Sequence, residues 1–290
     1  MQAGARALLP TGSIPVGIAP NSMDFALLQV GINSYPSATL RGCVNDCENL
    51  LRHFDAIKRP PIRRLALYDE AATRQNILDH LQWLLRVPAP LLVFQYSGHG
   101  ARVRDRNGDE PDKYDSAICP VDFWDTGLIL DDELGELYSS VDQSKRLVVL
   151  SDSCHSGQSQ RAITLKAKAL FRMDIPRFIH EDQIPTKAAA LARPVAGIKL
   201  TTRKAFLETN ERAVLISTSK ETQTSADAYV DKAWQGAGTA SLLWAWKELG
   251  INANYWDVAR VANTWLKKNS YSQVLRVEGQ SETKGRPLFT

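Results

Sequence analysis

Two apolar runs in this sequence, each ending at a turn of small residues, constrain the fold more than any other feature. Residues 91–97 lead into Gly98-His99-Gly100, and residues 146–152 lead into Ser153-Cys154. Each run has the length and composition of a strand buried on both faces, which is typical of a parallel sheet. If the two strands are neighbours, their carboxyl ends meet at one edge of the sheet. The pattern therefore predicts that His99 and Cys154 lie side by side.

A thiol beside an imidazole is an activated nucleophile, because the imidazole favours the thiolate that attacks a carbonyl carbon. The competing interpretation is a buried structural cysteine and a core histidine. The small polar residues around Cys154 and the glycines on both sides of His99 argue against it. We assign Cys154 as nucleophile and His99 as general base, and expect the N–H groups of Cys154 and Gly100 to form an oxyanion hole.

The rest of the chain alternates strand-like and helix-like patterns, which predicts an α/β fold with a mostly parallel central sheet of about six strands and helices on both faces. Expected strands include residues 24–32, 64–68 and 212–217, and residues 273–277 form a candidate edge strand. Helices are expected over residues 42–54, 73–85, 130–139, 239–249 and 255–267. We divide the chain into a flexible N-terminal leader, residues 1–23, and a single domain, residues 24–290.

Several ordered motifs resemble the metacaspases, called orthocaspases in bacteria, of the caspase-like clan of cysteine peptidases. The matching segments are YSGHG at 96–100, DSCHSG at 152–157, LRGCVND at 40–46 and ILDDEL at 129–134. The interval between histidine and cysteine is 154 − 99 = 55 residues, close to the ~50 of the caspase signature. The resemblance implies a caspase-like fold, and the compact arrangement indicates the bacterial type.

The resemblance also implies cleavage after Arg or Lys, with a substrate pocket built from Cys43, Asp46, Ser97 and Asp152. Carboxylates at the bottom of a narrow pocket suit a guanidinium, because a buried cation without a partner is very costly. The alternative for Asp152 is a carboxylate that caps a turn. Two carboxylates in one pocket repel each other unless a cation is bound, which favours Arg over neutral side chains.

Many members of the family need calcium, and the resemblance places that site on Asp115, Asp131 and Asp132. Members often supply a further Asp shortly after the catalytic cysteine, where this chain has Arg161. A positive charge at that place argues against tight calcium binding. Asp131 and Asp132 can instead stabilise the N-terminus of the helix that begins there. The peptidase chemistry itself requires no cofactor. Zinc on Cys43 and Cys47 is disfavoured because no second Cys/His pair accompanies them.

The segment from Gln158 to Glu211 interrupts the alternation. It has no clear strand pattern and carries ten Lys and Arg against five Asp and Glu. A helical subdomain or a surface loop is one interpretation. The other is a regulatory insertion that occludes the cleft and is cut, by the enzyme itself or by an upstream peptidase. The basic residues nearest to the nucleophile are the candidate processing sites: Arg161, Lys166, Lys168 and Arg172.

Composition excludes other classes of function. The net charge of +3 is too small to indicate nucleic acid as the main partner. No apolar stretch is long enough for a membrane span, and a reactive thiol suits the reducing cytoplasm. We expect a monomeric cysteine endopeptidase that acts on protein or peptide substrates, in a stress or defence cascade by family analogy. A catalytically silent caspase-like scaffold, or a peptidase of the same clan with another specificity, are the alternatives.

Overall fold

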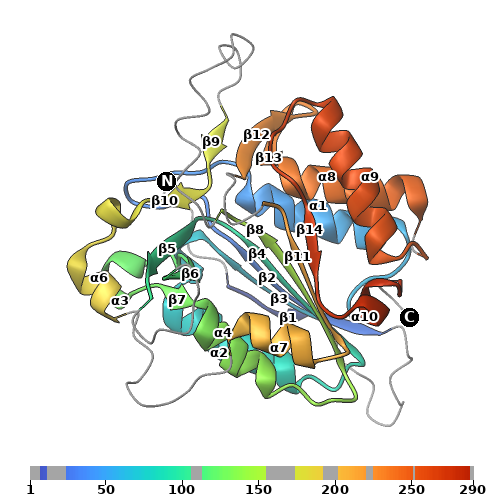
Figure 1. Cartoon of the computed structure of the whole chain (residues 1–290), viewed down its shortest axis with the longest axis horizontal. Coiled ribbons are helices and arrows are strands. Elements are labelled where there is room, and N and C mark those ends of the chain that lie inside the picture. Colours follow the sequence, from blue (N-terminus) through green and yellow to red (C-terminus); the bar gives the residue numbers. More distant parts are fainter. Residues whose placement is uncertain are drawn as a thin grey trace.

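A computed structural model describes residues 7–11, 24–105, 113–154, 174–191, 202–219, 225–250 and 252–287. Within these residues a seven-stranded sheet runs through the centre of the molecule in the order β1-β3-β2-β4-β8-β11-β14 (Figure 1). The five inner strands are parallel, and β1 and β14 pair antiparallel at the two edges. The strands are β1 Ala7–Thr11, β2 Phe25–Gly31, β3 Arg63–Tyr68, β4 Leu91–Ser97, β8 Arg146–Asp152, β11 Ala213–Ser217 and β14 Arg276–Glu278.

The inner strands are apolar on both faces because each face is covered by helices. In β2, Ala26, Leu28 and Val30 belong to one apolar cluster, whereas Phe25 and Leu27 belong to the other. Figure 1 shows α1, α8 and α9 over one face and α2, α4 and α7 over the other. The prediction of an α/β fold with a mostly parallel sheet between two helical layers is confirmed.

The helices keep the apolar periods seen in the sequence. The Thr73 side chain caps α2 by accepting a hydrogen bond from the Asn76 N–H at 3.2 Å, as its position before the apolar period predicts. The helices are α1 Cys43–Ala56, α2 Arg74–Arg86, α3 Phe123–Thr126, α4 Asp131–Ser139, α6 Thr186–Leu191, α7 Arg203–Thr209, α8 Ala237–Leu249, α9 Tyr255–Lys268 and α10 Ser281–Lys284, with short 3₁₀ turns at Asp69–Ala71 and Glu181–Gln183. No described helix is long and apolar enough to cross a bilayer.

Two small sheets lie beyond the carboxyl ends of β4 and β8 and build the surroundings of His99 and Cys154. One has the order β10-β5-β6-β7 and the other the order β13-β12-β9. Their strands are β5 Gly100–Arg104, β6 Tyr114–Ile118, β7 Ile129–Leu130, β9 Ile175–Pro176, β10 Phe178–Ile179, β12 Ala226–Val230 and β13 Ala233–Gly236. The segment that carries β9 and β10 therefore belongs to both small sheets.

Three segments differ from the sequence-based expectation. Within the leader predicted to be flexible, Ala7–Thr11 forms β1, because its backbone pairs with the edge of β3 and an edge strand tolerates Pro10. The insertion contains β9 and β10, which are too short to show an alternating pattern. The edge strand expected at 273–277 is β14, which pairs antiparallel with β11 and begins at Arg276.

Candidate active site

The sheet register places the two candidate catalytic residues at the same edge. Strands β4 and β8 are adjacent and parallel, and Ser97 lies opposite Asp152. His99 and Cys154 each follow two residues later, so both leave the sheet at its carboxyl end. The structure thus brings together the two turns that the sequence singles out.

The imidazole of His99 is held from two sides. Its Nε2 lies 2.5 Å from the Ala38 carbonyl oxygen, and its ring packs against Tyr35 in a tilted arrangement with centroids 4.6 Å apart. A carbonyl can only accept, so Nε2 carries the proton and Nδ1 is the basic nitrogen. Among the described residues Nδ1 has no hydrogen-bond partner. Burial, opposed by the bond to Ala38, lowers the pKa of His99 to about 4, so the ring is a neutral base.

The thiol of Cys154 is buried and engaged with Ser225. It donates a hydrogen bond to the Ser225 carbonyl oxygen at 3.3 Å, and the Ser225 N–H contacts Sγ in turn. Burial raises the pKa of Cys154 to about 12. Both pKa shifts favour the neutral forms, a thiol and an imidazole, over a thiolate and an imidazolium.

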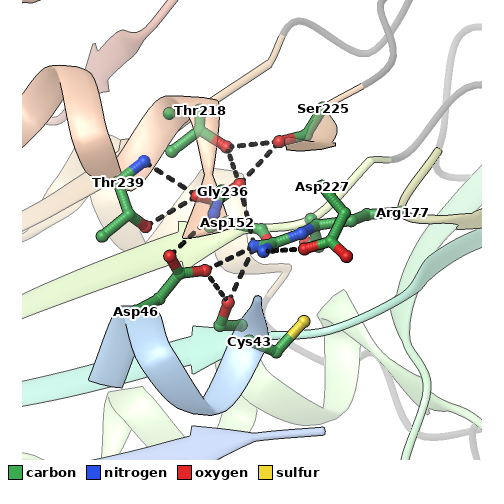
Figure 2. Close-up of polar contacts among 12 residues, drawn as sticks. Cys43, Asp46, Asp152, Arg177, Thr218, Ser225, Asp227, Gly236 and Thr239 are labelled. Carbon is green, nitrogen blue, oxygen red and sulfur yellow. Dashed lines mark hydrogen bonds and ion pairs between the residues drawn. The ribbon is translucent and has the colours of Figure 1, made fainter. Parts of the chain in front are cut away.

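A guanidinium fills the pocket that the sequence assigns to a basic substrate residue, and it comes from the chain itself. Arg177, between β9 and β10, is completely buried (Figure 2). Its Nη1 lies 2.8 Å from Asp46 Oδ2 and 3.3 Å from Asp152 Oδ1, and its Nη2 lies 2.8 Å from Asp227 Oδ1. Nη1 also donates to Ser97 Oγ at 2.8 Å. The cation is thus held by three carboxylates at two separate nitrogens.

The three carboxylates also accept hydrogen bonds from groups other than Arg177. Asp152 accepts hydrogen bonds from the hydroxyls of Thr218, Ser225 and Thr239, at 2.6 to 2.7 Å, and from the Thr239 N–H. Burial would raise the pKa of Asp152, but Arg177 and these hydroxyls outweigh burial and lower it. Asp152 is therefore ionised although it is buried.

Asp46 and Asp227 are anchored by backbone groups. Asp46 accepts from the Gly236 N–H at 2.7 Å, and Asp227 accepts from the N–H groups of Arg41 and Gly42. Burial and the neighbouring Asp152 raise the pKa of Asp46 to about 7, although Arg177 opposes the shift. Because burial disfavours the ionised form of a carboxylate, a bound cation stabilises this pocket.

The backbone of Arg177 is hydrogen-bonded to the turns that carry His99 and Cys154. Its carbonyl oxygen accepts from the Gly100 N–H at 3.0 Å and from the Cys154 N–H at 3.2 Å, the two groups expected to form the oxyanion hole. Its own N–H donates to the Ser225 carbonyl oxygen at 3.2 Å. Arg177 thus contacts the predicted pocket residues with its side chain and the two predicted oxyanion-hole N–H groups with its carbonyl.

The predicted pocket residues converge, and further ones join them. Asp46, Ser97 and Asp152 all contact Arg177, while Cys43 is buried nearby at the start of α1 (Figure 2). The sequence reading missed Asp227, which stands in a stretch with no recognisable pattern. It also missed Gly236, where a Cβ would lie 2.1 Å from Asp152 Oδ2 and 2.7 Å from Arg177 Nη1.

Arg161, Lys166, Lys168 and Arg172 lie outside the described residues, as does His155. Arg177 is one of the ten basic residues of the insertion, but the prediction favoured the basic residues nearest to Cys154 in the sequence. Arg177 lies in the pocket although it is further from Cys154 along the chain than the four candidates. Its position in the fold, and not its distance in sequence, brings it to the pocket carboxylates.

The carboxylates assigned to calcium have a cation of the chain beside them. Asp115 on β6 and the pair Asp131 and Asp132 at the start of α4 are all buried. Arg203, the first residue of α7, places its Nη2 4.0 Å from Asp131 Oδ2. Within the part of the chain that the structure describes, no three His, Cys, Asp or Glu side chains form a group that could hold a metal ion. Arg203 thus lies beside one of the three carboxylates that the resemblance assigns to calcium.

Comparison with known proteins finds similarity to the metacaspases. Residues 26–161 match the family model described as "Metacaspase, peptidase C14 domain". Metacaspase-1 of Coccidioides immitis is 30% identical over 81% of this chain and 59% of its own length. Metacaspase-1 of Yarrowia lipolytica is 43% identical over 45% of this chain and 31% of its own length. The chain thus spans about three fifths or less of these relatives.

Solved structures support the fold alone. Protein GSU0716 from Geobacter sulfurreducens aligns with a TM-score of 0.68 at 23% identity, over 92% of this chain and 98% of that one. Caspase-1 from Spodoptera frugiperda aligns with a TM-score of 0.56 at 9% identity, over 90% of this chain and 88% of that one. At these identities the likeness extends to the caspase-like architecture and not to substrate choice.

Proposed function

Since this chain belongs to the metacaspases, a family of cysteine peptidases in the caspase-like clan, we propose that it is an endopeptidase that cleaves after Arg, with Lys as second choice. The observation that carries the proposal is Arg177, whose guanidinium contacts three buried carboxylates while its carbonyl accepts from two N–H groups beside Cys154. A substrate Arg bound in the same way presents its carbonyl carbon to the thiol.

The proposed chemistry follows from the positions of the groups. Nδ1 of His99 takes the thiol proton, and the thiolate attacks the carbonyl carbon of the bound Arg. The N–H groups of Gly100 and Cys154 stabilise the oxyanion that forms. His99 then returns the proton to the leaving amine, the C–N bond breaks, and water hydrolyses the thioester. The hydrogen bond from Nε2 to the Ala38 carbonyl keeps His99 in the tautomer that leaves Nδ1 available for both proton transfers.

The preference for Arg over Lys rests on geometry. Two nitrogens of a planar guanidinium contact Asp46 and Asp227 on different sides, whereas a single ammonium cannot do so from one position. We compare peptides that differ only at the residue before the scissile bond. We expect kcat/KM for Arg to exceed that for Lys by about 10-fold or more, because Lys lacks one charge-assisted hydrogen bond. Peptides with Asp at this position are expected to remain uncut.

The same peptides test the pocket through Asp227. We expect Asp227→Asn to lower kcat/KM for the Arg peptide by about 10- to 100-fold. Asp231→Asn is the matched control, because Asp231 lies exposed at the turn of the same hairpin and contacts no pocket residue in the structure described. Efficient cleavage after Asp, or equal rates for the Arg peptide in all three proteins, would show that the pocket is assigned wrongly.

We further propose that activity does not depend on calcium, because Arg203 supplies a positive charge beside Asp131. Adding a chelator is expected to leave kcat/KM unchanged, and calcium is expected not to raise the unfolding temperature, since a ligand that binds only the folded state must raise it. Magnesium serves as the control cation. Loss of activity on chelation that calcium restores, with a calcium-dependent rise in unfolding temperature, would contradict this prediction.

Activation by cleavage within the insertion is also part of the proposal. Arg177 and the cleft lie in one chain, so a segment bound in this way excludes other substrates at a high effective concentration. Cutting the Arg177–Phe178 bond separates the two ends of the segment and allows the pocket to empty. We place the enzyme in a proteolytic cascade by family analogy.

A further inference from the structure

The residues that follow Arg177 are bound more deeply than those that precede it. Phe178 and Ile179 are 8% and 1% exposed, and Ile179 belongs to the main apolar cluster of the domain. Ile175 and Pro176, on the other side of Arg177, are only half-buried. A bound substrate therefore finds its larger apolar contact area beyond the scissile bond.

The same two residues form a β-ladder that is continuous with the oxyanion hole. Strand β10 pairs parallel with β5, with Phe178 opposite Gly100 and Ile179 opposite Ala101. The bond from the Gly100 N–H to the Arg177 carbonyl stands at the beginning of this pairing. A shift of the strand by one residue would move the Arg177 carbonyl out of the hole, so pairing with β5 sets which carbonyl is attacked.

Strand β5 is suited to receive a strand from a substrate. In the described sheet β10-β5-β6-β7, its only partner other than β6 is β10, so departure of β10 leaves an open edge (Figure 1). An extended peptide that adds to such an edge gains affinity from main-chain hydrogen bonds and specificity from its side chains. Departure of β10 also uncovers the apolar surface that Phe178 and Ile179 occupy.

From the ladder and the burial together, we propose that the enzyme selects protein substrates in which Arg is followed by two bulky apolar residues, an aromatic and then an aliphatic one, bound as a strand on β5. This inference rests on the proposed cleavage after Arg. The binding energy of these residues holds the scissile carbonyl between Gly100 and Cys154, so they accelerate the reaction and do more than tighten binding.

The test is a competition between peptides in one reaction of the wild-type full chain. The reference peptide copies residues 174–180, Asp-Ile-Pro-Arg-Phe-Ile-His, with blocked ends. A second peptide has Asp-Asp in place of Phe-Ile, a third has Leu-Val there, and a fourth keeps Phe-Ile but has Asp in place of the Ile before Pro. Mass spectrometry of the products gives the ratios of kcat/KM, which are unaffected by the fraction of enzyme whose own segment still fills the cleft.

We expect the Asp-Asp peptide to be cut about 10- to 100-fold more slowly than the reference, the effect of failing to bury one or two large apolar side chains. The Leu-Val peptide is expected to recover most of that loss, and the change before Pro to have a smaller effect than the Asp-Asp change. Equal rates for the reference and Asp-Asp peptides, both cut after Arg, would overturn this inference and leave the proposed function intact. Failure to cut any of the four after Arg would instead refute the proposed function.

Discussion

Replacing Cys154 with alanine is expected to abolish peptide cleavage, by on the order of 10⁴-fold or more in kcat, because no other group supplies the nucleophile. The fold should survive, since the change is small and removes only the contacts of the thiol with Ser225. Initial rates on an Arg peptide, with circular dichroism of the same samples, measure the two effects separately.

His99→Ala is expected to be almost as inactive as Cys154→Ala, because the imidazole both accepts the thiol proton and returns it to the leaving amine. His155→Ala is the matched control, since His155 directly follows the nucleophile in the sequence and is expected not to take part. An inactive His155→Ala protein beside an active His99→Ala protein would mean that the wrong histidine is paired with Cys154.

Arg177→Ala is the second variant with a large expected effect, and it acts on both processing and stability. The wild-type chain is expected to be cut between Arg177 and Phe178, whereas the Arg177→Ala chain stays whole at this bond. Intact-mass time courses of wild type, Arg177→Ala and Cys154→Ala distinguish the outcomes. Of these three proteins, only the wild type should form fragments that end at residue 177. The Arg177→Lys chain should form the corresponding fragments more slowly.

Stability is best measured in the Cys154→Ala background, where no chain is cut. Removing Arg177 leaves Asp46, Asp152 and Asp227 buried without their cation, and breaking a buried ion pair on one side costs about 3–5 kcal/mol. The double variant should therefore unfold at lower denaturant than Cys154→Ala alone. A wild-type chain that stays whole while fully active, or that is cut only at Arg161, Lys166, Lys168 or Arg172, would contradict the role given to Arg177.

The central fold could be read from the sequence because its signals are local. The apolar runs at residues 91–97 and 146–152 are strands β4 and β8, and the capped apolar period after Thr73 is α2. Once β4 and β8 are neighbours, their parallel pairing makes His99 and Cys154 leave the sheet at one edge, but it is the tertiary structure that shows the two strands to be neighbours. The resemblance of the motifs to those of the metacaspases predicted that Asp46, Ser97 and Asp152 share one pocket.

The tertiary structure alone determined what completes that pocket and what fills it. Asp227 reaches Arg177 because β12 pairs with β9, and Gly236 fits because the carboxylate of Asp152 leaves no room for a Cβ. Neither contact has a local signal, since each joins segments far apart in the chain. Arg177 is likewise one basic residue among ten in the insertion. Only the pairing of β9 and β10 with two different sheets places its carbonyl between Gly100 and Cys154 and its guanidinium among the three carboxylates.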